Sequence, residues 1–284
     1  KSEELLPLTE GALHDAIQAW LDSIGVANEG EVTEGISRTY LKELMAAKLT
    51  GQAADLQKDI LAHKEHVIKK TIWMYGGDGW AYDIGYGGLD HVMATNANVN
   101  IMLVDTEVYS NTGGSVLQGY ADRCRRSVRS FGPQVQQERF GPSAHDLWHI
   151  YIAQVALGAD ANQLIKAVKE AEAYNGPSIV IAYAPCINHG IKGGMGNAQN
   201  EMKRAVEAGY WHLYRYNPLL KEEGKNPFIL DSKEPTQSFR DYLLGETRYA
   251  ALTRTFPDIA EELFAKAEEF AAKKYEVYKE LADK

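Results

Sequence analysis

The sequence predicts an α/β fold in which a parallel β-sheet is flanked by helices, with helical extensions before and after it. Apolar runs of strand length recur between Thr71 and Ala184, and helical stretches separate them. Such continuous apolar runs are typical of parallel sheets, because helices cover both faces. The chain on either side of this region carries apolar residues at helical spacing instead. We therefore expect a helical arm at 1–70, an α/β domain at 71–200 and a helical extension at 201–284.

Three helices are predicted in the N-terminal arm, where glycines interrupt the helical pattern. The helices are Leu5–Ser23, Ile36–Leu49 and Gln52–His66, and the interrupting residues are Gly25, Gly30 and Gly51. None of these segments carries a recognisable catalytic motif, so we interpret the arm as a packing element.

Four strands are predicted in the α/β domain. They are Thr71–Tyr75, Val99–Asp105, Ile150–Leu157 and Ser178–Ala184. A glycine-rich turn and a helix to about Met93 follow the first strand, and a helix at Ala161–Tyr174 joins the last two. From about Asn197 the pattern is helical again, and Ala260–Ala282 is a long, highly charged amphipathic segment that suits a solvated face or a partner.

Composition and charge exclude several classes of protein. The 284 residues are 45% apolar and 24% charged, as in soluble globular proteins. The net charge of −9 argues against nucleic-acid binding, and no apolar run is long enough to span a membrane. Two cysteines, Cys124 and Cys186, exclude a disulfide framework and suit a reducing, cytoplasmic location. Because the chain begins at Lys1 without a cleavage signal, we expect it to be a fragment.

Two segments that each follow a predicted strand indicate a metal–diphosphate site. They are Gly76–Trp80 and Asp105–Gly114, and carboxyl ends of parallel strands are where α/β sheets bind ligands. A diphosphate chelated to Mg²⁺ needs hard oxygen ligands and nearby backbone N–H donors. Asp78 offers a carboxylate, and 28 residues later Thr106 offers a hydroxyl, with the carbonyl of Val108 two residues on. Either segment alone is an ordinary turn or loop, whereas the pair at this spacing favours the metal site.

Several runs of residues carry a resemblance to a known family. The main runs are G-G-D-G-W-A-Y-D-I-G-Y-G-G-L-D-H-V from Gly76, V-D-T-E-V-Y-S-N-T-G-G from Val104, A-Y-A-P-C-I-N-H-G from Ala182 and E-A-G-Y-W-H-L-Y-R-Y-N-P from Glu207. In these runs the chain resembles the C-terminal, thiamine-diphosphate-binding part of pyruvate:ferredoxin (flavodoxin) oxidoreductases. The similarity extends from Thr71 to about Leu252, except for 115–150. It implies a thiamine-diphosphate-binding fold of the diphosphate-binding type.

The resemblance also assigns roles to individual residues. It implies that Asp78, Thr106 and the Val108 carbonyl hold Mg²⁺, and that the amide of Asn111 faces the reacting carbon and the substrate carboxylate as a catalytic group. The residues implied to line the cofactor are Gly77, Asp78, Gly79, Trp80, Thr106, Glu107, Val108, Tyr109, Ser110 and Asn111. Glu107 lies on the diphosphate side, so it is a poor candidate for the glutamate that activates thiamine.

Cys186 has two interpretations. A lone cysteine after a strand is usually a small buried hydrophobic residue. Within A-Y-A-P-C-I-N-H-G, however, it matches the family's fourth ligand to the [4Fe–4S] cluster nearest the thiamine. Such a cluster needs four thiolates, and the resemblance places the other three before Lys1. His189 is interpreted as a structural neighbour of Cys186 and not as a ligand.

The implied reaction is CoA-dependent oxidative decarboxylation of pyruvate to acetyl-CoA and CO₂, with electrons passing through Fe–S clusters to ferredoxin or flavodoxin. The expected partners are therefore pyruvate, CoA, the electron carrier, the rest of the polypeptide and a second copy in a homodimer, with neither nucleic acid nor membrane. The isolated fragment is expected to be inactive. Two alternatives stay open: a related 2-oxoacid:ferredoxin oxidoreductase with another substrate, and a non-catalytic subunit with the thiamine fold.

The segment 115–150 does not fit the rest of the chain. It holds five of the eleven arginines and none of the nineteen lysines. The family continues Q-S-S-K-A-T-P after S-N-T-G-G, whereas this chain continues S-V-L-Q-G-Y-A-D from Ser115. Codons for Ser115–Ser130 exist that, shifted by one base, encode Q-S-S-K-A-T-P-T-G-A-V-A-Q-F-A. We therefore interpret 115–150 as a frame-shifted translation and assign no function to Cys124 or to the arginines there.

Overall fold

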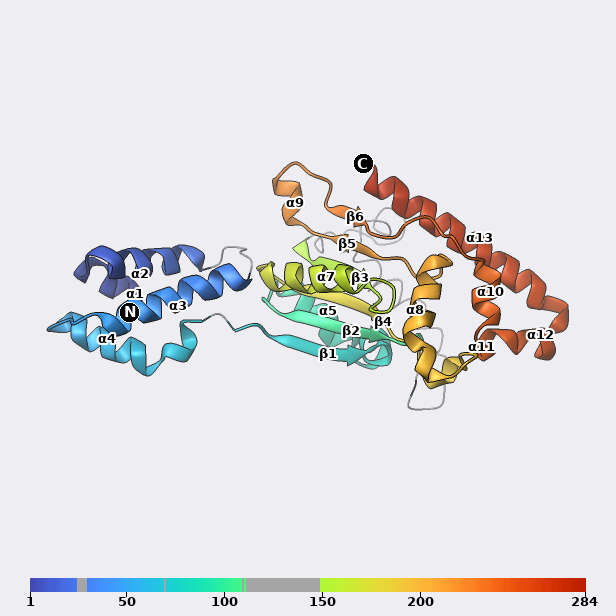
Figure 1. Cartoon of the computed structure of the whole chain (residues 1–284), viewed down its shortest axis with the longest axis horizontal. Coiled ribbons are helices and arrows are strands. Elements are labelled where there is room, and N and C mark those ends of the chain that lie inside the picture. Colours follow the sequence, from blue (N-terminus) through green and yellow to red (C-terminus); the bar gives the residue numbers. More distant parts are fainter. Residues whose placement is uncertain (25–29, 69, 109, 111–148) are drawn as a thin grey trace. The chain divides into compact units, whose positions relative to one another are not determined.

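A six-stranded β-sheet forms the centre of the larger of two compact units (Figure 1). The computed structural model describes residues 1–24, 30–68, 70–108, 110 and 149–284. The smaller unit comprises Lys1–Ile72 with Glu172–Asn175, and the larger comprises Trp73–Ala171 with Gly176–Lys284. No helix in these ranges is long and apolar enough to cross a membrane.

The sheet is mostly parallel, as the sequence predicts. Its order is β1-β2-β4-β3-β5-β6, in which the first four strands are parallel and β5 and β6 are antiparallel to their neighbours. The strands are β1 (Trp73–Gly77), β2 (Asn100–Asp105), β3 (Tyr151–Val155), β4 (Ser178–Tyr183), β5 (Tyr214–Tyr216) and β6 (Phe228–Leu230). Every residue of β3 is buried, and all but one of β4, which explains their continuous apolar pattern.

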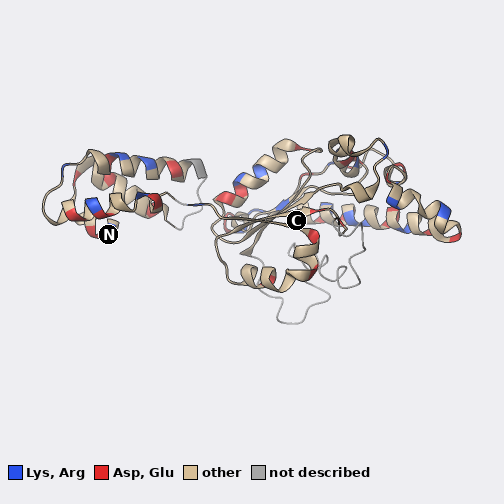
Figure 2. Cartoon of the chain, turned by 90° about the horizontal axis from the view of Figure 1, so that it is seen from below, with Lys and Arg blue, Asp and Glu red and all other residues tan. Residues whose placement is uncertain are grey.

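Helices cover both faces of the sheet (Figures 1 and 2). The connection from β1 to β2 runs through α5 (Tyr86–Ala94), and that from β3 to β4 runs through α7 (Ala161–Ala173). In the strand order, the step from β1 to β2 runs in one direction along the sheet and the step from β3 to β4 runs in the other. Because crossovers between parallel strands are right-handed, the two helices lie on opposite faces. Leu89 and Met93 of α5 pack in one core with Ile101 and Leu103 of β2.

The C-terminal part is helical, but it also contributes β5 and β6 to the sheet, which the sequence pattern did not predict. Three-residue strands are too short to show a period of two. The helices here are α8 (Ala198–Glu207), α9 (Leu219–Glu222), α10 (Phe239–Leu244), α11 (Thr247–Ala250), α12 (Leu252–Thr255) and α13 (Pro257–Ala282). Short 3₁₀ turns are η6 (Ile187–His189) and η7 (Met195–Asn197). Helix α13 begins three residues before the predicted start because Pro257 occupies the first turn, where proline is favoured.

The smaller unit is helical, as expected, around its own apolar core of residues such as Ile17, Tyr40 and Leu44. Its elements are α1 (Ser2–Leu5), η1 (Leu6–Leu8), α2 (Gly11–Ser23), α3 (Gly30–Ala46), α4 (Gln52–Ala62) and η2 (Lys64–His66). Helix α3 begins at Gly30 and not at the predicted Ile36. Gly30 was predicted to separate two helices, but it is the first residue of α3. A glycine costs little at a helix terminus, so it is a weak marker of where a helix ends.

Candidate functional site

Three adjacent strands end beside one another and present the predicted site residues. Asp78 directly follows β1, Thr106 directly follows β2, and Cys186 lies three residues after β4. Since β1, β2 and β4 are neighbouring parallel strands, their carboxyl ends share one edge of the sheet. That edge is where open α/β sheets place their ligands.

The hydroxyl of Thr106 lies at the centre of a cluster of oxygen atoms. Its Oγ1 is 3.3 Å and 3.4 Å from the two carboxylate oxygens of Asp78, 2.9 Å from the carbonyl of Val108 and 3.0 Å from Oγ of Ser110. A hydroxyl has one proton and can donate to only one of these acceptors at a time. We call this set of four residues the oxygen cluster.

The oxygen cluster brings the three predicted Mg²⁺ ligands together. Adjacent ligands of an octahedral Mg²⁺ lie about 3 Å apart, close to the separations around Thr106 Oγ1. The cluster contains one carboxylate, and no group of three or more His, Cys, Asp or Glu side chains that could hold a metal occurs in the part of the chain that the structure describes. Its chemistry of one carboxylate, hydroxyls and a carbonyl fits a hard divalent cation that takes further ligands from a diphosphate.

A buried turn after β1 positions Asp78. The side chain of Asp78 is buried, and its Oδ1 accepts the N–H of Gly79 at 3.0 Å. The next residue, Trp80, begins the π-helical turn Trp80–Ile84. Its ring lies so close to Gly76 and Gly85 that a Cβ on either would come within 2.3 Å of a ring atom. These glycines are thus required by the packing of Trp80, while Gly77 is exposed and leaves the backbone open at the edge.

Asp105 anchors the loop after β2, a role that no sequence pattern indicates. Its carboxylate is fully buried and accepts the Tyr82 hydroxyl at 2.7 Å and the N–H of Glu107 at 2.9 Å. An aspartate at the end of a strand is an ordinary feature of a sequence. The hydrogen bond from Tyr82, which lies in the turn after β1, shows that Asp105 connects the loop after β1 with the loop after β2.

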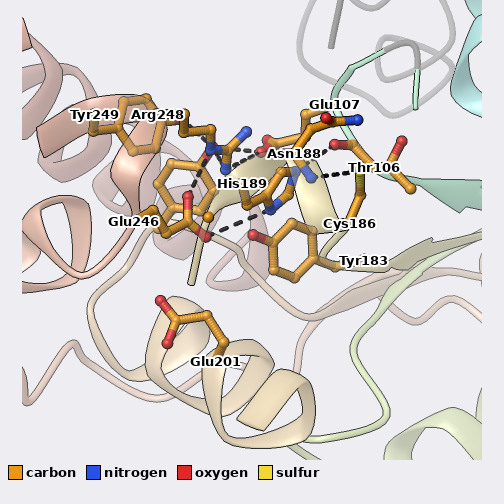
Figure 3. A network of polar contacts seen from close by, with 12 residues as sticks. Thr106, Glu107, Tyr183, Cys186, Asn188, His189, Glu201, Glu246, Arg248 and Tyr249 are labelled. Atoms are coloured by element: carbon orange, nitrogen blue, oxygen red, sulfur yellow. Dashed lines mark hydrogen bonds and ion pairs between the residues drawn. The ribbon is translucent and has the colours of Figure 1, made fainter. Parts of the chain in front are cut away.

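The carboxylate of Glu107 points towards Arg248 (Figure 3). It accepts the hydroxyl of Tyr210 at 2.5 Å and pairs with Nη2 of Arg248 at 2.9 Å. Burial and the charge of Glu107 raise the pKa of Tyr210 well above its usual value, so this hydroxyl stays protonated and donates. The Glu107 carboxylate is therefore already bound by two side chains, and the lining of a cofactor by Glu107 stays a prediction.

Cys186 is tied to the loop after β2. It is buried and precedes η6, and its Sγ accepts the N–H of Asn188 at 3.2 Å. Asn188 Nδ2 donates to the carbonyl of Ser110 at 3.1 Å, and His189 Nε2 lies 2.7 Å from the carbonyl of Thr106. The predicted metal loop and the predicted cluster-ligand loop thus share two hydrogen bonds.

A buried charged network continues from His189 towards the C-terminal helices (Figure 3). Nδ1 of His189 lies 3.5 Å from Oε1 of Glu246, and Oε2 of Glu246 pairs with Arg248 Nε at 2.6 Å. Glu201, fully buried nearby, pairs with Arg204 at 2.8 Å. Burial raises the pKa of the Glu201 carboxyl, although Arg204 opposes the shift.

Several predicted positions lie outside the described residues. These are Tyr109, Asn111, and most of the segment 115–150 including Cys124; only its last two residues, His149 and Ile150, are described. The catalytic role of Asn111 therefore stays a prediction.

The chain is similar to proteins of known family. A family model described as "Thiamine pyrophosphate enzyme, C-terminal TPP binding domain" matches residues 46–182. The chain is 49% identical over 288 residues to a pyruvate:ferredoxin oxidoreductase of Moorella thermoacetica, covering 99% of this chain and 24% of that protein. For a pyruvate-flavodoxin oxidoreductase of Klebsiella pneumoniae the identity is 48% over 277 residues, covering 98% and 23%. For one of Enterobacter agglomerans it is 51% over 223 residues, covering 78% and 19%. The chain therefore spans less than a quarter of the length of these relatives.

Proposed function

This chain belongs to the pyruvate:ferredoxin (flavodoxin) oxidoreductase family as its thiamine-diphosphate-binding part, and from that we propose that it holds the Mg²⁺–diphosphate end of thiamine diphosphate in an enzyme that oxidatively decarboxylates pyruvate. The single observation that carries the proposal is the oxygen cluster around Thr106 Oγ1. Asp78 and Thr106 come from separate loops, 28 residues apart, yet they meet at the edge of the sheet where ligands bind.

The oxygen cluster would offer Mg²⁺ one charged ligand and two neutral ones. Asp78 would supply negative charge to Mg²⁺, while the Thr106 hydroxyl and the Val108 carbonyl would supply neutral oxygens. The open backbone at Gly77 would let diphosphate oxygens approach. Thiamine diphosphate, when bound, supplies the electron sink that lets CO₂ leave a 2-oxoacid. Asn111 is proposed to orient the substrate carboxylate by hydrogen bonding.

Glu107 is not proposed as the thiamine-activating glutamate. Its carboxylate is held by Arg248 and Tyr210. We propose that the activating glutamate comes from another part of the polypeptide.

Cys186 is proposed as one of four thiolate ligands to a [4Fe–4S] cluster that takes up the electrons of the reaction. Pyruvate and CoA would give acetyl-CoA, CO₂, one proton and two electrons, and the cluster that Cys186 would help to hold would supply a one-electron acceptor on the way to ferredoxin or flavodoxin. Support comes from the two hydrogen bonds that tie the Cys186 loop to the metal loop, since they keep the proposed electron acceptor beside the proposed cofactor. A homodimer and a cytoplasmic location are proposed from the resemblance and the composition.

Calorimetry on the full-length polypeptide tests the metal assignment. We expect thiamine diphosphate to bind only with Mg²⁺, and Asp78→Asn to weaken this binding by about tenfold or more, because it removes the only carboxylate of the oxygen cluster. Asp90→Asn, at an exposed position on α5, is the matched control and should bind like the wild type. Binding that ignores both Mg²⁺ and the Asp78 substitution would refute the assignment, and a wild type without pyruvate-dependent CO₂ release would refute the proposed activity.

A further inference from the structure

The backbone between two of the proposed Mg²⁺ ligands has an unusual conformation. Glu107 has a φ of 62°, in the left-handed region that residues other than glycine rarely adopt. Thr106 precedes it and Val108 follows it, and this turn brings Thr106 Oγ1 to 2.9 Å from the Val108 carbonyl. The convergence of two proposed metal ligands therefore depends on the strained residue between them.

Three contacts hold Glu107 in this conformation. Its N–H donates to the buried carboxylate of Asp105, and its own carboxylate is bound by Tyr210 and Arg248. The Glu107 and Arg248 side chains are only 11% and 15% exposed. Separating the two partners of a buried ion pair leaves each charge uncompensated, so the pair opposes any movement of Glu107 that would break it.

Arg248 is itself fixed from several sides. Its Nε pairs with Glu246 at 2.6 Å, and its guanidinium lies 4.5 Å above the ring of Tyr249. The preceding residue, Thr247, donates its N–H and its hydroxyl to the Gly190 carbonyl, at 2.9 Å and 2.8 Å. Gly190 has a φ of 63°, and a Cβ there would lie 2.6 Å from Thr247 Cβ. Helix α11 is thus docked directly against the loop that carries Cys186.

We propose that Glu107 and Arg248 are positioning residues for Mg²⁺: the buried pair holds the left-handed turn that sets Thr106 and Val108 at ligand distance. The proposal rests on the function proposed above. Neither side chain is itself a ligand, because the Glu107 carboxylate points towards Arg248 and Tyr210 and Arg248 is a cation (Figure 3). The C-terminal element α11, 141 residues from Glu107, thereby controls the affinity of the metal loop.

The test uses the full-length enzyme and measures the Mg²⁺ dissociation constant at saturating thiamine diphosphate. Glu107→Gln and Arg248→Met should each weaken Mg²⁺ binding by about 10- to 100-fold, as loss of a group that orients a metal ligand does. The double variant should be no worse than the worse single variant, because both remove the same pair. Arg248→Lys, which keeps the charge but not the fork of donors, should recover part of the affinity. Excess Mg²⁺ should restore kcat in every variant that folds.

The matched control is Arg240→Met, which removes an arginine bonded to Glu261 and Glu268 on α13. It should leave the Mg²⁺ dissociation constant unchanged. Unchanged affinity in the folded Glu107→Gln or Arg248→Met enzyme, or equal losses in the control, would overturn the positioning role. A wild type that binds no Mg²⁺–thiamine diphosphate would instead overturn the proposed function on which it rests.

Discussion

His212 is a buried histidine of the larger unit that lies outside the metal loop, and its protonation makes the stability of the fold depend on pH. Its side chain is 1% exposed, and its Nε2 has no hydrogen-bond partner among the described residues. The rings of Tyr275 and Tyr278 of α13 lie 5.8 Å and 5.4 Å from its imidazole. Burial, with a smaller contribution from Lys274, lowers the pKa of His212 from 6.5 to about 3. The folded protein therefore keeps this histidine neutral.

Stability should fall in weak acid because of His212. In the unfolded chain an imidazole takes up a proton near pH 6.5, whereas in the folded protein it does so only near pH 3. Its contribution is therefore complete above about pH 6.5 and is lost as the pH falls from there towards about 3, by up to about 1.4 kcal/mol for each pH unit. Chemical denaturation of wild type and His212→Phe between pH 4.5 and 7.5 checks this, and the variant should show a flatter profile.

The comparison needs a control histidine from the same unit. His91→Gln replaces an exposed imidazole on α5 and should keep the wild-type dependence on pH. Parallel profiles for wild type and His212→Phe would contradict the assignment of this pH dependence to His212.

Among the elements, the three-residue turn η6 connects Cys186 with the loop after β2. It positions Cys186 through the N–H of Asn188, and it places His189 and Asn188 against the loop after β2. Hydrogen bonds to sulfur are one means by which proteins adjust an Fe–S cluster. The turn therefore holds the proposed cluster ligand Cys186 next to the proposed Mg²⁺ site, at one edge of the sheet.

Replacing Cys186 should damage one cluster. In the full-length enzyme, Cys186→Ser should reduce or alter one [4Fe–4S] signal in low-temperature EPR spectra of the reduced protein and slow carrier reduction, because a thiolate ligand is lost. Ile187→Ala, a change at an exposed neighbour in the same turn, should leave the spectra intact. Wild-type spectra from the Cys186→Ser enzyme would return this residue to the role of a packed thiol.

At the scale of the whole molecule, the family resemblance that the sequence motifs carry extends from Thr71 to about Leu252, and we interpret 115–150 as an interruption in it. We predict that sequencing the gene across Gly114 and His149 will reveal a one-base shift near each position, with Q-S-S-K-A-T-P following Gly114 in the native frame. The physical reason for expecting a native segment is that natural sequences agree with their fold along their whole length. An uninterrupted frame that encodes S-V-L-Q-G-Y-A-D would refute the prediction.

The sequence by itself determined the order of the parallel strands along the chain and the residues that follow them. Continuous apolar runs report burial on both faces, so β2, β3 and β4 were predicted to within two residues at each end. The spacing of Asp78 and Thr106 predicted that they meet, because adjacent parallel strands end at one edge. Both inferences use patterns that are local to a segment or to two neighbouring segments.

Only the tertiary structure decided what holds the site in place. Arg248 meets Glu107 across 141 residues of chain, and His189 meets the Thr106 carbonyl across 83. No periodicity predicts such pairs, because they depend on how strands and helices from distant segments are arranged around the sheet. The strands β5 and β6 were missed for the same reason: three residues become a strand when a neighbouring edge offers hydrogen bonds, and that edge exists only in the folded chain.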